Sequence, residues 1–549
     1  MIKKLLSACG APRLWVVALL AGIFWGAEFW QRDLWEPDEA RYAYVSREMR
    51  EDGHWLVPHR SGEYYAHKPP LIFWLNNAFA TLNGGQINRV TTRLPTLIGT
   101  ILSLWATGQI AALLFGGASG WLAPLLLAVS TLFWVVNGMG QIDGLLCGLE
   151  MLAFWLLLST PSPRGSGHLR IAAAYLSMGL AVLAKGPVGL LIPLGAWIAF
   201  SFFADQRHRL RNWHLLWGPL LALLPVALWL GTIVYFKAAP EGYLDELLFK
   251  QNVGRAAGTF ATGHAKPFWY FITYFIADFL PWTLLLPAAL LALKVDTTRR
   301  IEICGVLAWM LFVILFFSLS ATKRNLYILM AYPAAAILLA AGWGRITSLP
   351  DRFRKVSQWL LAGLFLLLGL GLVLTAPIIR IVGIELPFET AWLVPGGIVL
   401  TLTAVLLMRP ALKAGNSCRW LATAATGFAM TLWLIALLVY PVLNPIKAPY
   451  ELAEAAQRHL HEGKPLLLYR INGEIQALYC NVRGRVVKTP EELSEAIRQQ
   501  DNGMVVLHNK QWEEIADIPA IAAGSRGEYR MGSKTMIWVA FDLGKSPDL

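Results

Sequence analysis

The stretch RLWVVALLAGIFWGAEFW, from Arg13 to Trp30, decides the fold. It is apolar over almost its whole length and matches the roughly 20 residues that a helix needs to cross a bilayer. The segment DLWEPDEARYAYVSREM, Asp33–Met49, follows at once and is dense in carboxylates and arginines. A membrane span that leads directly into so much charge predicts an integral membrane protein with polar chemistry at the membrane surface.

Apolar runs like the first one recur along most of the chain. Of its 549 residues, 56% are hydrophobic and only 15% are charged, which is unusual for a water-soluble domain. We count thirteen such runs, near 13–30, 93–115, 120–138, 143–160, 171–184, 187–203, 214–236, 268–293, 303–320, 326–344, 356–380, 392–408 and 420–442. The pattern predicts an α-helical polytopic membrane protein with about thirteen transmembrane helices.

The basic residues between these runs predict the orientation. RHRLR at Arg207–Arg211 and RFRK at Arg352–Lys355 lie in loops that would share one face, which is the cytoplasmic face by the positive-inside rule. The N-terminus is then cytoplasmic and belongs to an uncleaved signal anchor. The long loops 31–92 and 237–267, together with the C-terminus, are expected on the outer face.

The composition becomes soluble after residue 443. PYELAEAAQRHLHEG and TPEELSEAIRQQ read as helices, and KPLLLYR and GMVVLHN read as strands. We therefore expect a transmembrane domain over 1–443 and a small α/β domain over 444–549. The net charge of +12 is scattered between apolar spans, so it does not indicate nucleic-acid binding, and the cysteine spacing indicates neither a disulfide framework nor a metal site.

The first outer loop carries the strongest candidates for chemistry. On a helix that begins near Pro37, Asp38 and Arg41 are three residues apart and pair, with Glu39 beside them. A solvated interfacial helix with paired charges is the simpler explanation. Against it, aromatic neighbours such as Tyr42 place these charges at headgroup depth, where unused charge is costly.

Further polar residues fall at the same predicted face. The motif YYAHKPPLIFW supplies His67 and Lys68, and a lysine at this depth either snorkels or binds a lipid phosphate. The other outer-face candidates each have a plainer explanation: a helix cap for Asp143, snorkelling for Lys185, and a topological role for the others, which are Arg255, Lys323, Arg324 and Tyr327. Together they are able to hold a phosphate by charge-assisted hydrogen bonds.

The order of these motifs resembles a known family. PDEARYAYVSREM, HKPP, QID, LAKGP, NVGR, FLPWTLLLP and KRNLYIL are similar to motifs of the GT-C membrane glycosyltransferases. The likeness is strongest to the bacterial 4-amino-4-deoxy-L-arabinose lipid A transferases, which are related to the protein O-mannosyltransferases. It covers nearly the whole chain and is most specific in the first loop.

The resemblance implies a function and roles for the site residues. It implies an inverting transferase in the bacterial inner membrane that moves a sugar from undecaprenyl phosphate to lipid A or another envelope acceptor at the periplasmic face. Asp38, Arg41 and Asp143 would be catalytic. Glu39, Lys68, Lys185, Arg255, Lys323 and Tyr327 would bind substrate. His67 and Asn252 depart from the family's metal-linked positions, so no cofactor is required, although His67 remains a candidate ligand for a divalent metal.

Two other functions stay open from the sequence. One is a protein O-glycosyltransferase that uses the same kind of donor. The other is a transporter of lipid-linked sugars, which should show charged residues at the bilayer midplane and related halves of the chain. The candidate residues instead gather at one face, and no internal repeat is visible.

Overall fold

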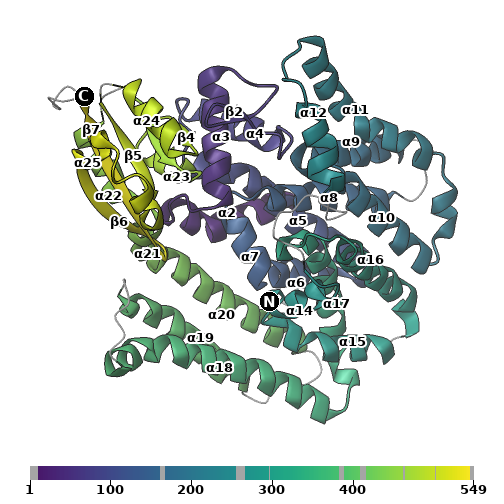
Figure 1. Ribbon diagram of the computed structural model, residues 1–549. Coiled ribbons are helices and arrows are strands. Elements are labelled where there is room, and N and C mark those ends of the chain that lie inside the picture. The colour runs from purple at the N-terminus through teal and green to yellow at the C-terminus, as the bar shows by residue number, and fades with distance from the viewer. Residues whose placement is uncertain are drawn as a thin grey trace.

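A bundle of membrane helices carries a small sheet domain on one side (Figure 1). The computed structural model describes residues 10–160, 167–254, 266–295, 297–382, 389–408, 416–460, 464–500 and 502–543.

Nine helices in these ranges are long and apolar enough to cross a membrane, and two bent helix pairs raise the number to eleven. The nine are α2 (Leu14–Gln31), α5 (Arg89–Phe115), α8 (Ile142–Ser159), α9 (Gly167–Lys185), α11 (His214–Tyr235), α16 (Arg300–Ser318), α18 (Asp351–Val382), α19 (Val394–Met408) extended at its start by η7 (Thr390–Leu393), and α20 (Ser417–Leu438). The bent pairs join α6 (Gly117–Ala128) to α7 (Thr131–Gly138), and α14 (Tyr270–Asp278) through η3 (Trp282–Leu284) to α15 (Leu286–Val295).

The thirteen predicted spans all coincide with helices, but not all of these helices have the length of a full crossing. The remaining two are α10 (Val188–Phe203) and α17 (Ala331–Trp343), which are shorter apolar helices of 16 and 13 residues. The prediction of a polytopic helical membrane protein is therefore confirmed, and the count is nine to eleven candidate spans in the described part of the chain.

The two bent helix pairs contact each other at the points where their helices are broken. The backbone N–H and the hydroxyl of Thr131 both donate to the carbonyl of Leu280, at 3.1 and 2.9 Å. Breaks inside an apolar bundle free backbone groups that must find partners, and here one break supplies the partner for the other.

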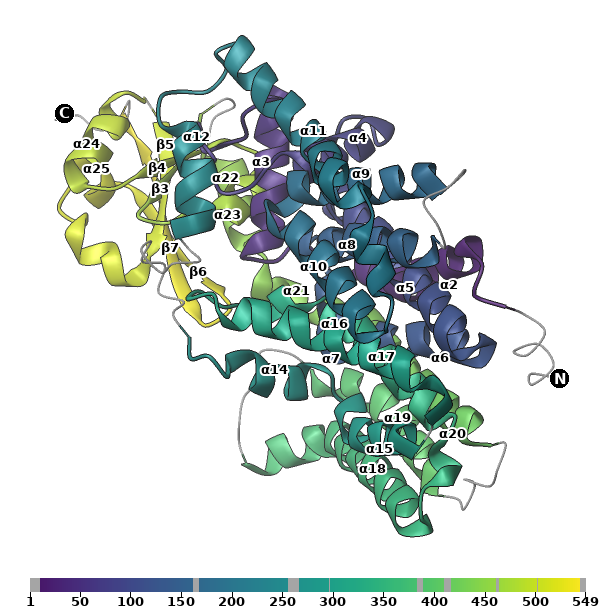
Figure 2. The ribbon, with the colours of Figure 1, turned by 90° about the vertical axis from the view of Figure 1, so that its right-hand side faces the viewer.

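Several helices present an apolar surface outward. Leu220 on α11 and Leu367 on α18 are both 70% exposed, and α18 has one of the least buried spans of the bundle. Side chains of this kind on the outside of a bundle are suited to contact with lipid. In Figure 2, α18 and α19 form the lower edge of the molecule, away from the sheet domain.

The first loop is folded rather than irregular. α3 (Asp38–Asp52) begins directly after Pro37, as predicted, and ends at Gly53, whose φ of 71° suits glycine. The hairpin of β1 (His59–Arg60) and β2 (Glu63–Tyr64) follows, and then α4 (Leu71–Leu82), which starts after Pro69 and Pro70. In the second long loop, α12 (Tyr243–Asp245) runs into η2 (Glu246–Gly254).

The C-terminal part contains a five-stranded mixed sheet in the order β4-β3-β5-β7-β6. β3 (Leu466–Tyr469) pairs in parallel with β4 (Gly484–Val487) and β5 (Asn502–His508), and β7 (Lys534–Asp542) pairs antiparallel with β5 and β6 (Ser525–Met531). The connecting helices are α21 (Tyr440–Lys447), α22 (Tyr450–His459), α23 (Glu474–Tyr479), α24 (Pro490–Arg498), η8 (Asn509–Glu514) and α25 (Pro519–Ala522). The predicted α/β domain is present, and Thr489 caps α24 by accepting the N–H of Glu492.

α3 lies between the bundle and this sheet domain (Figure 1). The backbone N–H of Gly484 donates to the Tyr44 hydroxyl at 3.0 Å, and Arg47 donates to the carbonyl of Val482 at 2.7 Å. Asp52 near the end of the helix pairs with Arg483. The helix that carries the predicted catalytic residues is therefore fixed from the side of the sheet domain.

Candidate active site

A polar cavity of about 390 Å³ opens at the start of α3. Its lining comes from the first loop, from the ends of two bundle helices and from the turn before α17: Pro37, Asp38, Arg41, Tyr42, Tyr65, His67, Lys68, Asp143, Lys185, Thr322, Arg324 and Tyr327. Residues far apart in the sequence thus converge on one space, and most of the predicted site residues are among them.

Asp38 lies in this cavity close to several cationic side chains. Its carboxylate is 5% exposed, accepts a hydrogen bond from Arg324 at 2.7 Å and lies 3.4 Å from the guanidinium of Arg41. Burial alone would raise the pKa of the Asp38 carboxyl, but the charges of Arg324, Arg41 and Lys68 outweigh it and hold the pKa below its usual range. Asp38 is therefore ionised at neutral pH.

Of the adjacent basic pair, Arg324 faces the cavity and the predicted Lys323 does not. Arg324 has extended backbone, with φ −129° and ψ 139°, and neighbouring side chains in extended chain point to opposite sides. Lys323 is 4% exposed, and its ammonium donates to the carbonyls of Lys266, at 3.1 Å, and Ser320. Arg324 therefore lines the cavity, whereas the substrate-binding role of Lys323 stays a prediction.

Glu39 is also placed differently from the prediction. It is 2% exposed and does not line the cavity, because its side chain points into the bundle. There it accepts hydrogen bonds from Arg93 at 2.5 and 3.1 Å and from the backbone N–H of Gly140 at 2.9 Å, with Arg32 at 3.6 Å. Glu39 therefore anchors the first turn of α3 to the bundle, and its contact with a substrate stays a prediction.

Asp143, Lys185 and Tyr327 form a second polar wall. Asp143 is in the first turn of α8 and pairs with Lys185 in the last turn of α9. The Lys185 ammonium lies 4.7 Å from the centre of the Tyr327 ring. The ion pair and the cation–π contact fix the ammonium at the edge of the cavity.

His67 lies close to an acidic side chain of the second long loop. Its Nε2 lies 3.8 Å from Glu246 at the start of η2. Within the described ranges, no group of three His, Cys, Asp or Glu side chains gathers closely enough to hold a metal ion. His67 and Glu246 alone do not make a complete metal site. The predicted Arg255 lies outside the described residues.

The arrangement matches the chemical needs of a phosphate ester. Arg41, Lys68, Lys185 and Arg324 bring four cations to one cavity, where they are able to donate charge-assisted hydrogen bonds to phosphate oxygens. The carboxylates of Asp38 and Asp143 stand among these cations. One region of the cavity thus suits a dianion, while a carboxylate remains beside it.

Known proteins share sequence and fold with this chain. A family model described as dolichyl-phosphate-mannose-protein mannosyltransferase matches residues 67–231. The crystal structure of ArnT from Cupriavidus metallidurans bound to undecaprenyl phosphate superposes with a TM-score of 0.76 at 20% identity, covering 96% of this chain and 97% of that one. The chain therefore has an ArnT-like fold.

Curated sequences extend the ArnT-like relationship. The undecaprenyl phosphate-alpha-4-amino-4-deoxy-L-arabinose arabinosyl transferase of Serratia proteamaculans is 29% identical over 323 residues, 56% of this chain and 55% of that protein. A protein of the same description, numbered 2, from Proteus mirabilis is 27% identical over 410 residues, 73% of this chain and 71% of its own. The match to the Serratia protein thus spans little more than half of its length.

Proposed function

We propose that this ArnT-like chain is an inverting glycosyltransferase that takes a sugar from a polyprenyl-phosphate donor. The observation that carries the proposal is the cavity in which Asp38 stands among Arg41, Lys68, Lys185 and Arg324. A donor of this kind needs cations for its phosphate and a carboxylate near its anomeric carbon, and the cavity offers both.

In the donor half of the reaction, the bond between the anomeric carbon and the phosphate oxygen breaks. The electron pair stays on that oxygen, so negative charge grows on the polyprenyl phosphate. Lys68, Lys185 and Arg324 would stabilise this charge in place of an acid, since cations already positioned in a partly buried site need little reorganisation.

In the acceptor half, an acceptor oxygen attacks the anomeric carbon from the opposite face and inverts it. An acceptor hydroxyl would give its proton to Asp38, whereas an ionised phosphate has no proton to give. The low pKa of Asp38 makes it a weak base, since a general base works best with a pKa near the operating pH. The geometry therefore favours Asp38 as a fixed negative charge beside an oxocarbenium-like sugar, with an acceptor that is already ionised.

The names of the relatives suggest the finer assignment. The Serratia and Proteus proteins are described as aminoarabinosyl transferases that use undecaprenyl phosphate, and the Cupriavidus protein was crystallised with undecaprenyl phosphate. We propose that the donor is undecaprenyl phosphate carrying 4-amino-4-deoxy-L-arabinose, and that a phosphate group of lipid A is the acceptor. The reaction would take place at the periplasmic face of the bacterial inner membrane.

Mass spectrometry of lipid A, with and without the gene, tests this assignment. A pentose-amine mass shift that requires the gene and is lost in Asp38→Asn is the expected result. Unchanged lipid A would indicate that the acceptor is another envelope glycan or a protein. Accumulation of the donor on one leaflet of a deletion strain, with no glycosylated product lost, would contradict transfer and favour a transporter.

A further inference from the structure

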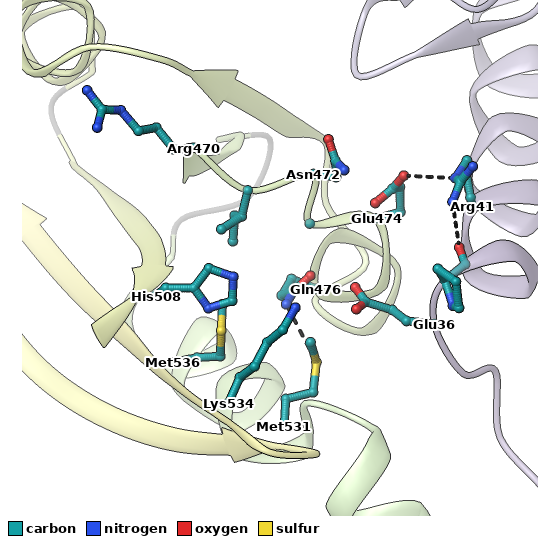
Figure 3. A pocket seen from close by; sticks show the side chains of 13 residues that line it. Glu36, Arg41, Arg470, Asn472, Glu474, Gln476, His508, Met531, Lys534 and Met536 are labelled. Carbon is teal, nitrogen blue, oxygen red and sulfur yellow. Dashed lines mark hydrogen bonds and ion pairs between the residues drawn. The ribbon is translucent and has the colours of Figure 1, made fainter. Parts of the chain in front are cut away.

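A second pocket lies where the sheet domain meets the segment before α3. Its volume is about 190 Å³. Figure 3 shows the side chains that line it, and only Pro37 and Arg41 among them also line the cavity that contains Asp38. The side chains that carry the argument are Glu36, Arg41, Glu474, Gln476, His508 and Lys534. Neither the resemblance to the GT-C enzymes nor the cavity of Asp38 accounts for this pocket.

The pocket lies at a favourable position of the sheet. Its wall at 470–474 follows β3, and His508 ends β5, so the pocket opens at the carboxyl ends of two neighbouring parallel strands. In open α/β sheets, ligands bind in the crevice at these ends. Gly473 shapes the wall: its φ is +54°, and a Cβ there would lie 2.4 Å from Leu468.

The polar groups of the pocket have unused hydrogen-bonding capacity. Gln476 is 1% exposed; its amide nitrogen donates to the Tyr529 hydroxyl at 3.3 Å, whereas its Oε1 has no hydrogen-bond partner in the described chain. Glu36 and Lys534 are exposed and belong to no ion pair or side-chain hydrogen bond found among the described residues. In Figure 3 the carboxylate of Glu36 and the ammonium of Lys534 both point toward the space beside Gln476.

This mixture of groups selects the class of ligand. The carboxylate of Glu36 and the amide oxygen of Gln476 accept hydrogen bonds, and the ammonium of Lys534 donates them. The negative charge of Glu36 and the positive charge of Lys534 nearly cancel. The pocket is smaller than the roughly 300–1,000 Å³ of sites for drug-sized ligands. A single neutral ring that both donates and accepts hydrogen bonds through several hydroxyl groups fits these conditions.

Arg41 connects this pocket to the cavity of Asp38. Arg41 and Pro37 line both spaces. The guanidinium of Arg41 lies 3.4 Å from Asp38 on one side and 3.6 Å from Glu474 on the other, and Glu474 also pairs with Arg60 of the β1–β2 hairpin. A ring bound beside Glu474 would thus lie one side chain away from the reacting centre.

We propose that the pocket lined by Glu36, Gln476, His508 and Lys534 is a binding subsite for one sugar ring, distinct from the cavity where transfer occurs. The source of the ring rests on the proposed function, because it is a saccharide either of the acceptor glycolipid or of the lipid-linked donor. The hydroxyl-rich ring is the chemistry common to both.

Photo-crosslinking of the full chain tests the subsite. A photoreactive residue replaces Asn472 in the pocket wall, and a matched control replaces the exposed Arg498 on α24. Proteoliposomes contain purified lipopolysaccharide, a purified polyprenyl-phosphate sugar, or phospholipid alone. We expect an adduct with the mass of a sugar-bearing lipid at position 472 but not at 498, and the arm that yields it identifies the source.

Two variants sharpen the readout. Gln476→Leu and Lys534→Ala each remove one polar group, and the adduct at position 472 should fall roughly tenfold, the factor that corresponds to loss of a buried or charged hydrogen bond. An adduct at 472 no stronger than at 498, or one made only of phospholipid, would overturn the proposal.

The experiment also separates this proposal from the proposed function. Asp38→Asn should abolish transfer and keep the adduct at position 472, because Asp38 does not line the pocket. An adduct without transfer by the wild-type chain would retain the subsite and remove the transferase assignment. Transfer by the wild-type chain without an adduct at position 472 would retain the transferase assignment and remove the subsite.

Discussion

Arg324 donates a 2.7 Å hydrogen bond to Asp38 across 286 positions of sequence. Arg324 precedes η5 (Asn325–Ile328), in the turn between α16 and α17, whereas Asp38 begins α3 in the first loop. The bond therefore joins two segments that only the fold brings together. It holds the carboxylate in the ionised form and sets the charge of the cavity on which the proposed transfer depends.

Asp38→Asn should abolish sugar transfer while the chain still folds. The amide keeps the shape of the side chain but removes the negative charge beside the anomeric carbon, and positioned acid–base or electrostatic groups typically contribute about 10²- to 10⁴-fold. Turnover of a lipid-linked donor in proteoliposomes measures the loss. Asp245→Asn, at an exposed acid of the second loop, is the control and should keep wild-type activity. Equal turnover by both variants would remove Asp38 from the mechanism.

Arg324→Ala should shift the acid limb of the pH–rate profile to higher pH. Burial raises the pKa of Asp38, and Arg324 is the strongest of the charges that lower it. Without the guanidinium, the pKa rises, so the carboxylate takes up a proton and activity is lost at a higher pH than in the wild type. Lys323→Ala is the adjacent control: it changes a cation bound to backbone carbonyls and should leave the midpoint in place. An unmoved midpoint in Arg324→Ala would contradict the assignment.

Glu39→Gln should destabilise the fold rather than weaken substrate binding. The change leaves Arg93 and Arg32 buried with their shared carboxylate removed, and breaking a buried ion pair costs about 3–5 kcal/mol. Unfolding of the purified chain in detergent measures the effect. Glu302→Gln, in the more exposed Arg299–Glu302 pair, should change stability by at most about 1 kcal/mol. A Glu39→Gln chain of normal stability with a raised KM would instead support the original substrate-binding role.

Lys185→Met should weaken donor binding through loss of a cation. A hydrogen bond to a charged group contributes about 1.5–3 kcal/mol, so KM for the donor should rise roughly 10- to 100-fold. The double variant Asp143→Leu with Lys185→Met tells phosphate binding from simple pairing, since removal of both partners leaves no unpaired charge. Recovery of the donor KM in the double variant would mean that Lys185 serves only to neutralise Asp143.

Local features of the site were predictable from the sequence. Asp38 and Arg41 are three residues apart on one helix, so their contact follows from helical geometry once Pro37 is taken as its start. The helical spans and the strands of the C-terminal domain follow equally from hydrophobic patterning, which is a property of neighbouring residues. Asp143 and Lys185 were predicted as separate candidates, but their direct pairing was not.

Features that depend on side-chain direction or on distant contacts were not predictable in this way. Lys323 and Arg324 have the same charge and adjacent positions, and only the extended backbone decides which of them faces Asp38. Glu39 was a candidate because it is next to Asp38 in the sequence, and its buried partner Arg93 lies on a different helix, which the local pattern does not reveal. Arg93 did offer a signal, since an arginine inside an apolar span needs a buried partner.

The position of α3 constrains chimeras in which the C-terminal domain is exchanged between related proteins. Its first turn is bound to the bundle through Glu39, and its later turns are bound to the sheet domain through Tyr44 and Arg47. A chimera that grafts a foreign C-terminal domain onto this bundle must therefore carry a matching outer face of α3. A substitution on that face that removes these contacts would free the sheet domain to move relative to the cavity that contains Asp38, although no residue of that cavity has changed.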